Sequence, residues 1–159
     1  MQSADTVTSH NEPNLLARFI ARFPVDRDST LLSTPQHQDY SYAHALDQSA
    51  RIARYLSSRG VKPGDRVTVQ VEKSPAAVWV YLACLRAGYI FHPLNMDYQR
   101  DELAYFLSDA EPAIVVCDPL QSAAIASVAP DPSALVTLDA HGEGELTTES
   151  ESLSTDFPI

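Results

Sequence analysis

Histidine and cysteine side chains are the first candidates for metal binding or nucleophilic chemistry, and this sequence spaces them poorly for either. The five histidines are His10, His37, His44, His92 and His141. They are scattered, without metal-ligand spacing or a nearby carboxylate pattern. Cys84 and Cys117 stand alone in apolar stretches and form no C-x-x-C pair, which favours buried, reduced thiols. The sequence therefore predicts no metal site.

His92 is the most interesting of these residues because it ends a predicted strand, and α/β sheets bind ligands at the carboxyl ends of their strands. Asp97 and Tyr98 follow on the same loop, but no spacing connects them with a substrate. A packed or half-exposed histidine is the more common case. His92 is therefore not assigned a catalytic role.

A phosphate site between strand and helix usually needs a glycine-rich turn. None of the five glycines makes such a turn. After a predicted strand the chain reads Glu72, Lys73, Ser74 and Pro75, which indicates a helix cap. Lys73 can meet an anion, but a surface lysine at a helix start is far more common. With no G-x-S-x-G motif and no plausible Ser-His-Asp set, the sequence predicts no catalytic, cofactor-binding or metal-binding residue.

The elements that would position such residues alternate between helix and strand. Apolar periodicity, caps and breakers predict helices at 15–23, 42–59, 75–87, 100–108 and 121–128. Short apolar or β-branched runs predict strands at 67–71, 89–92, 113–117 and 135–138, with an extended stretch at 30–33. This order favours an α/β fold, a doubly wound, mainly parallel sheet with flanking helices.

Two helices carry further expectations. In helix 42–59, Asp47 and Arg51 are four residues apart, which predicts an ion pair on the outer face. The stretch Ala76 to Leu85 is apolar on every side, so it must be covered from more than one direction. Where the cover is incomplete, we expect an exposed apolar surface that can self-associate.

Charge is distributed unevenly. All eleven Lys and Arg residues lie at or before Arg100, and twelve of the 21 acids follow it. The acidic part is either a solvated face and tail or a surface for a basic partner. Nucleic acid is excluded by the absence of a basic stripe. The longest apolar run is ten residues, too short to span a membrane, and a polar leader at 1–13 lacks the features of a secretory signal. We expect a cytoplasmic protein.

The run Gly60 to Val71, GVKPGDRVTVQV, continues as EKSPAAVWVYLACLRAGYIFHPLN to Asn95. Together with DELAYFLSDAEP at 101–112 and VVCDP at 115–119, it resembles the opening of the adenylate-forming (AMP-binding) superfamily. These enzymes include acyl-CoA synthetases, luciferases and peptide-synthetase adenylation domains. The resemblance spans about 14–119 and is closest to the malonyl-CoA synthetase branch.

This resemblance implies an acid–thiol ligase that uses ATP and Mg²⁺ to adenylate a carboxylate and then transfers the acyl group to CoA. It implies a partial N-terminal AMP-dependent synthetase/ligase domain over 14–139. The family's phosphate loop, magnesium ligand and catalytic lysine come after the segment seen here, so no cofactor site and no catalytic residue is transferred. His92 and Tyr89 stand where the family has an aliphatic and a small residue.

From Ala140 to Ile159 the chain is rich in Gly, Glu, Ser and Thr, which predicts an acidic flexible tail or linker, disordered from about Gly142. The first hypothesis is an N-terminal fragment of an acyl-CoA synthetase, inactive alone, whose partner is the remainder of the synthetase or a second copy. The alternative is a freestanding, non-enzymatic module that binds another protein. Whether the chain is itself an enzyme stays open.

Overall fold

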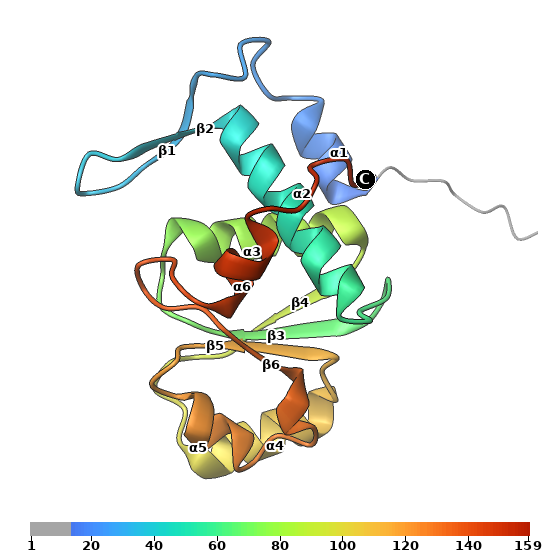
Figure 1. The fold of residues 1–159 in the computed structure, drawn as a ribbon, viewed down its shortest axis with the longest axis vertical. Coiled ribbons are helices and arrows are strands. Elements are labelled where there is room, and N and C mark those ends of the chain that lie inside the picture. Colours follow the sequence, from blue (N-terminus) through green and yellow to red (C-terminus); the bar gives the residue numbers. More distant parts are fainter. Residues whose placement is uncertain (1–13) are drawn as a thin grey trace, which may run out of the picture.

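A four-stranded parallel sheet lies at the centre of the computed structural model, which describes residues 14–159 (Figure 1). Its strands, in the spatial order β4-β3-β5-β6, are β4 (Ile90–Pro93), β3 (Arg66–Gln70), β5 (Ile114–Cys117) and β6 (Leu135–Thr137). Val67 of β3 pairs with Phe91 on one side and Ile114 on the other. The predicted α/β fold with a parallel sheet is confirmed.

Helices cover both faces of this sheet, as Figure 1 shows. On one face lie α1 (Leu15–Ile20), α2 (Tyr42–Ser58), α3 (Pro75–Ala87) and α6 (Glu145–Ser150). On the other face lie α4 (Arg100–Ala110) and α5 (Ser122–Ala126), and a 3-10 turn at Pro132–Ala134 precedes β6. A separate antiparallel hairpin pairs β1 (Thr30–Ser33) with β2 (Asp39–Ser41) and extends away from the sheet.

The connections leave β3 and β5 in opposite directions. From β3 the chain passes through α3 to β4 on one side, then crosses over β3 through α4 to reach β5 on the other side. Such a reversal makes a topological switch point, and ligands of open α/β sheets bind outside the strand ends there. The ends of β3, β4 and β5 therefore frame the first place to look for a site.

Local capping explains where the main helices begin and end. The Ser41 side chain accepts a hydrogen bond from the His44 amide at the start of α2, and the Ser74 side chain accepts one from the Ala77 amide at the start of α3. Gly88 ends α3 with a φ of 70°, a left-handed conformation that glycine adopts without strain. The cap at Ser74 agrees with the sequence-based prediction of a helix cap before Pro75.

The two sheet faces carry separate cores. Val67 and Val69 point into the larger core, which also contains Leu56 of α2 and Val80 of α3. The smaller core consists of Leu103, Leu107, Val115, Cys117 and Ile125. Because β5 contributes to both cores, its continuous apolar run is explained by burial on both faces.

The segment from Ala140 differs from the expected flexible tail. It contains α6, whose Leu146 is 0% exposed and joins the larger core. The Glu145 amide donates to Thr137 Oγ1 over 3.0 Å, which fastens the helix start to β6. At Gly144 φ is 148°, and an added Cβ would lie 2.4 Å from the Thr137 carbonyl oxygen. One fully buried leucine, two partly buried apolar side chains at Leu153 and Phe157 and a close backbone approach thus order a segment whose composition resembles a disordered one.

The predicted ion pair between Asp47 and Arg51 is wrong. Within residues 14–159 the one ion pair joins Arg59 to Glu145, with Nη1 and Oε1 2.9 Å apart. Arg51 instead donates Nη1 to the Glu151 carbonyl, because α6 brings that backbone group alongside α2. The predicted leader at 1–13 lies outside the described residues.

Candidate functional site

His92 is tied to the central strand at the carboxyl edge of the sheet. Its Nδ1 lies 2.8 Å from Thr68 Oγ1, and Thr68 is fully buried. One ring nitrogen is thereby committed to a structural hydrogen bond. Tyr98, on the loop that follows, stacks on Phe106 of α4, and their ring centroids are 5.0 Å apart. The structure does not bring His92, Asp97 and Tyr98 together into a catalytic group.

Gln70 anchors the loop after β4 to the end of β3. Its side chain is 2% exposed, and Nε2 donates to the Asn95 carbonyl over 2.8 Å. Its other polar atom, Oε1, is buried and has no hydrogen-bond partner among residues 14–159. Buried amides normally satisfy both atoms, so Gln70 is the most unusual polar residue at the switch point. Sequence reasoning did not single it out because β3 reads as an ordinary buried strand.

A cavity of about 270 Å³ opens beside this loop. Its lining comes from the loop after β4, the first turns of α4 and the start of α5, and consists of Met96, Tyr98, Gln99, Arg100, Leu103, Gln121 and Ala124. Arg100 is the one cation in this lining, and Asp101 and Glu102 follow it in the first turn of α4. These acids disfavour the binding of a polyanion, such as a nucleoside triphosphate, at the start of α4.

A second set of cavities lies between the hairpin, α3 and the chain before α6. One of about 530 Å³ is lined by Lys73, Ser74 and His141, among others. Within the described part of the chain Lys73 forms no ion pair, and it follows β3, where the sequence placed a possible anion contact. The Ser74 hydroxyl is already used as a helix cap. One lysine and a capped helix start make a weak anion site.

Aromatic side chains form the adjoining wall. The rings of Tyr40, His44 and Trp79 have centroids 5.2 to 5.7 Å apart and line a cavity of about 190 Å³. Burial lowers the pKa of His44, while nearby Asp47 acts in the opposite direction. His44 is therefore a packed, neutral ring at pH 7.

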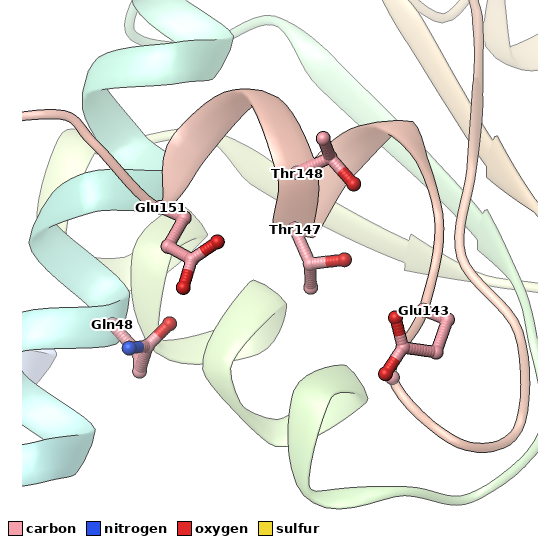
Figure 2. A pocket seen from close by; sticks show the side chains of 6 residues that line it. Gln48, Glu143, Thr147, Thr148 and Glu151 are labelled. Carbon is pink, nitrogen blue, oxygen red and sulfur yellow. The ribbon is translucent and has the colours of Figure 1, made fainter.

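A neighbouring cavity has a volume of about 310 Å³, and Figure 2 shows the side chains that line it. Gln48 of α2 and Glu151 lie at one end and Glu143 at the other, with Thr147 and Thr148 of α6 between them. Across residues 14–159, no three His, Cys, Asp or Glu side chains gather closely enough to hold a metal ion. The cavity is a polar hollow with two separate carboxylates.

The two cysteines are buried and free, as predicted. Burial raises the pKa of the Cys84 thiol to about 12. Burial and the nearby Asp118 raise the pKa of Cys117 to about 11. Both thiols stay protonated at neutral pH, so neither is a nucleophile in the folded protein.

Sequence reasoning missed two polar clusters that hold α6 and the chain after it. In one, Tyr55 donates its hydroxyl to Glu145 Oε1 over 2.9 Å, and Arg59 Nη1 bonds both groups. Burial, and next the hydrogen bond to Glu145, raise the pKa of Tyr55 to about 12. In the other, Arg86 is 8% exposed and donates to two backbone carbonyls, of Leu46 and Phe157, and to the Ser49 hydroxyl. Because backbone acceptors occur at every residue, the sequence carries no signal for the second cluster.

Comparison with known proteins decides the family. The family model described as "AMP-binding enzyme" matches residues 16–158. The chain belongs to the AMP-binding enzyme family. Among solved structures it is similar to MatB from Rhodopseudomonas palustris, without ligand and with ATP bound, at 40% identity and a TM-score of 0.85. The match covers 92% of this chain and 29% of MatB, and it confirms the resemblance found in the sequence.

Curated relatives extend the comparison. The chain is 31% identical over 113 residues to novobiocin biosynthesis protein H from Streptomyces niveus, covering 71% of this chain and 19% of that protein. It is 36% identical over 81 residues to a dimodular nonribosomal peptide synthase from Bacillus subtilis, covering 51% of this chain and 3% of that protein. An acyl-CoA synthetase from Brucella canis, 19% identical with a TM-score of 0.78, shares the fold.

The chain therefore spans less than a third of MatB and smaller shares of these curated relatives. Within residues 14–159, none of the helices has the length and apolar character needed to cross a membrane.

Proposed function

We propose that this chain is the N-terminal part of an ATP-dependent acyl-CoA synthetase, which adenylates a carboxylate and then forms a thioester with CoA. The observation that carries the proposal is the match to MatB, at 40% identity and a TM-score of 0.85 over 92% of this chain. One of the matching MatB structures has ATP bound. Malonate is the proposed acid, because the sequence resembles the malonyl-CoA synthetase branch.

In this proposal the chain acts as scaffold. Its parallel sheet and two cores hold the strand ends, while Gln70 fixes the loop after β4 by its hydrogen bond to Asn95. ATP, Mg²⁺ and CoA would bind to parts of the synthetase outside this chain. The described residues offer neither a glycine-rich phosphate turn nor a cluster of basic side chains facing one cavity, which tight binding of a triphosphate needs.

Charge supports inactivity of the chain alone. Twelve acids follow Arg100 without a Lys or Arg among them, and their field repels a polyanion at low salt. We therefore expect the chain alone to give no acyl-adenylate. Pyrophosphate release with malonate or acetate, with and without CoA, and calorimetry with ATP and Mg²⁺ measure this directly. Turnover that survives repurification and is lost in Lys73→Ala or His92→Ala would show that the scaffold is an active site.

A chimera tests the positive half of the proposal. In it, residues 14–159 replace the matching 29% of MatB, and malonate-dependent pyrophosphate release is measured with ATP and Mg²⁺. We expect activity above that of MatB lacking this segment. The matched control carries Leu107→Asp, which places a charge in the smaller core and prevents folding of the grafted part. A folded but inactive chimera, with MatB itself active, contradicts the proposal.

The partner expected under this proposal is the remainder of the synthetase, and the proposed location is the cytoplasm. The alternative, a freestanding module that binds another protein, predicts a folded chain without affinity for the rest of a synthetase. Sedimentation at increasing concentration, with and without a MatB piece lacking the matched segment, separates the two. Binding to that piece supports the synthetase, and a folded chain that does not bind it supports the module.

A further inference from the structure

Three arginines hold the segment 151–157, close to the end of the described residues, by its backbone. Arg51 Nη1 donates to the Glu151 carbonyl, and Arg54 donates Nε to the Ser154 carbonyl over 3.1 Å and Nη2 to the Asp156 carbonyl. Arg86 Nη1 donates to the Phe157 carbonyl over 2.9 Å. The first two arginines lie on α2 and the third on α3, so the segment is fastened to both helices.

Arg86 differs from the other two because it is buried, at 8% exposure. Besides the Phe157 carbonyl, its guanidinium donates to Ser49 Oγ over 3.1 Å and to the Leu46 carbonyl over 3.2 Å. All three acceptors are neutral, and within residues 14–159 Arg86 forms no ion pair. Burial lowers the pKa of Arg86, while Asp47 acts in the opposite direction.

A buried cation without a carboxylate partner is a poor way to gain stability. Well-packed apolar side chains of similar volume are often equally or more stabilising at such positions. The guanidinium has a directional property that an apolar side chain lacks, since its planar fork of donors reaches several acceptors at fixed angles. Here those acceptors belong to α2 and to Phe157. The arrangement indicates that Arg86 serves to position the chain at Phe157 relative to α2 and adds little to the stability of the fold.

We propose that Arg86 is a positioning residue that fixes the path of segment 151–157 against α2 and α3, and thereby the direction in which the synthetase chain continues toward its ATP-binding part. The second half of this statement rests on the proposed function. The first half concerns this chain alone. Arg51 and Arg54 reinforce the path from the exposed side of α2.

Amide hydrogen exchange on residues 1–159 tests the first half, with Arg86→Met as the variant and Arg59→Met as the matched control. Arg59 contacts Ser133 and Glu145, outside the segment. In Arg86→Met we expect exchange of the amides at 153–157 to rise at least tenfold, and strand amides of β3 and β5 to change less than twofold. Arg86→Lys, which keeps the charge but loses the fork, should give an intermediate rise.

Unchanged exchange at 153–157 in Arg86→Met would overturn the role of Arg86. An equal rise in β3 and β5 would overturn it as well, because it would show a general loss of stability. Should Arg86→Met fail to fold, Arg86→Lys decides by the same comparison. The expected pattern is confined to the segment and absent from Arg59→Met.

The chimera with MatB tests the second half. There, Arg86→Met should raise the KM for ATP at least fivefold and leave the KM for malonate within twofold. Raised exchange at 153–157 with an unchanged KM for ATP would overturn the link to ATP. An inactive chimera rejects the proposed function, whereas the exchange experiment on the chain alone gives its answer independently of any activity.

Discussion

The central strands and the segment 139–159 are ordered by opposite means. Strand β5 is buried on both faces by two apolar cores, and β3 contributes Val67 and Val69 to the larger of them. The segment 139–159 has one fully buried apolar side chain, Leu146, and two partly buried ones, Leu153 and Phe157, that pack against the larger core. Polar contacts from α2 and α3 hold its backbone and Glu145. Apolar burial contributes through area, whereas each polar contact contributes modestly and needs its geometry. A segment that looks disordered by composition can thus be held in place by donors elsewhere in the chain.

The largest expected effect comes from removing the one fully buried apolar side chain of the segment 139–159. Leu146→Ala should lower the free energy of unfolding by about 2–5 kcal/mol, the usual range for a buried leucine, as measured by urea denaturation. Leu120→Ala is the control, because Leu120 is 92% exposed, and should change stability by less than about 0.5 kcal/mol. If Leu146→Ala and Leu120→Ala had equally small effects, the segment 139–159 would not unfold cooperatively with the rest of the domain.

The next effect concerns the two buried cysteine thiols, Cys84 and Cys117. The pKa of Cys84 is raised to about 12 and that of Cys117 to about 11, from an ordinary value of 9.0. The folded protein therefore keeps these protons where the unfolded chain loses them, so the free energy of unfolding should be unaffected below about pH 9 and fall above it. Denaturation between pH 7 and 11 measures this.

The double variant Cys84→Ala and Cys117→Ala is the control for that experiment. It should lose less stability than the original protein over the same rise in pH, although Tyr55, with its pKa raised to about 12, still contributes above pH 10. Identical pH profiles for the two proteins would contradict a dry environment for the thiols, as would rapid labelling of either thiol in the folded protein at pH 8.

The smallest expected effect is at the ion pair that fastens α6. Glu145→Gln keeps an acceptor for Tyr55 and removes the charge facing Arg59. Since the two side chains are 42% and 29% exposed, the loss should be about 0.2–1 kcal/mol and should shrink in 1 M salt. Thermal melts at low and high salt check it. A larger loss that does not change with salt would contradict an exposed ion pair as the source of the effect.

Apolar patterns made most of the fold predictable. The run at 113–117 and the amphipathic helix from Tyr42 are placed within one or two residues of the observed elements. Ser74 carries the predicted helix cap, because a cap is a local contact between neighbouring residues. Membership of the family followed from the same region, where motifs are short and specific in their order.

The rest depends on contacts between residues far apart in the chain. Strand β2 is only three residues long, and α6 is ordered by Leu146 reaching a core built mainly by other elements. Gln70 and Arg86 read as an ordinary strand residue and an ordinary helix residue, since their partners are backbone carbonyls of Asn95 and Phe157. No pattern in a single sequence identifies such pairs.

The close approach at Gly144 has a consequence for how this chain tolerates variation. Around it stand glutamates, serines and threonines that are exchangeable in a solvated linker, so a comparison of composition alone would treat the whole stretch as freely variable. At Gly144, however, any side chain would meet the Thr137 carbonyl oxygen at 2.4 Å. In a saturation library selected for folded protein, position 144 should therefore retain glycine alone. The exposed positions of Thr148 and Glu149 should accept nearly every residue.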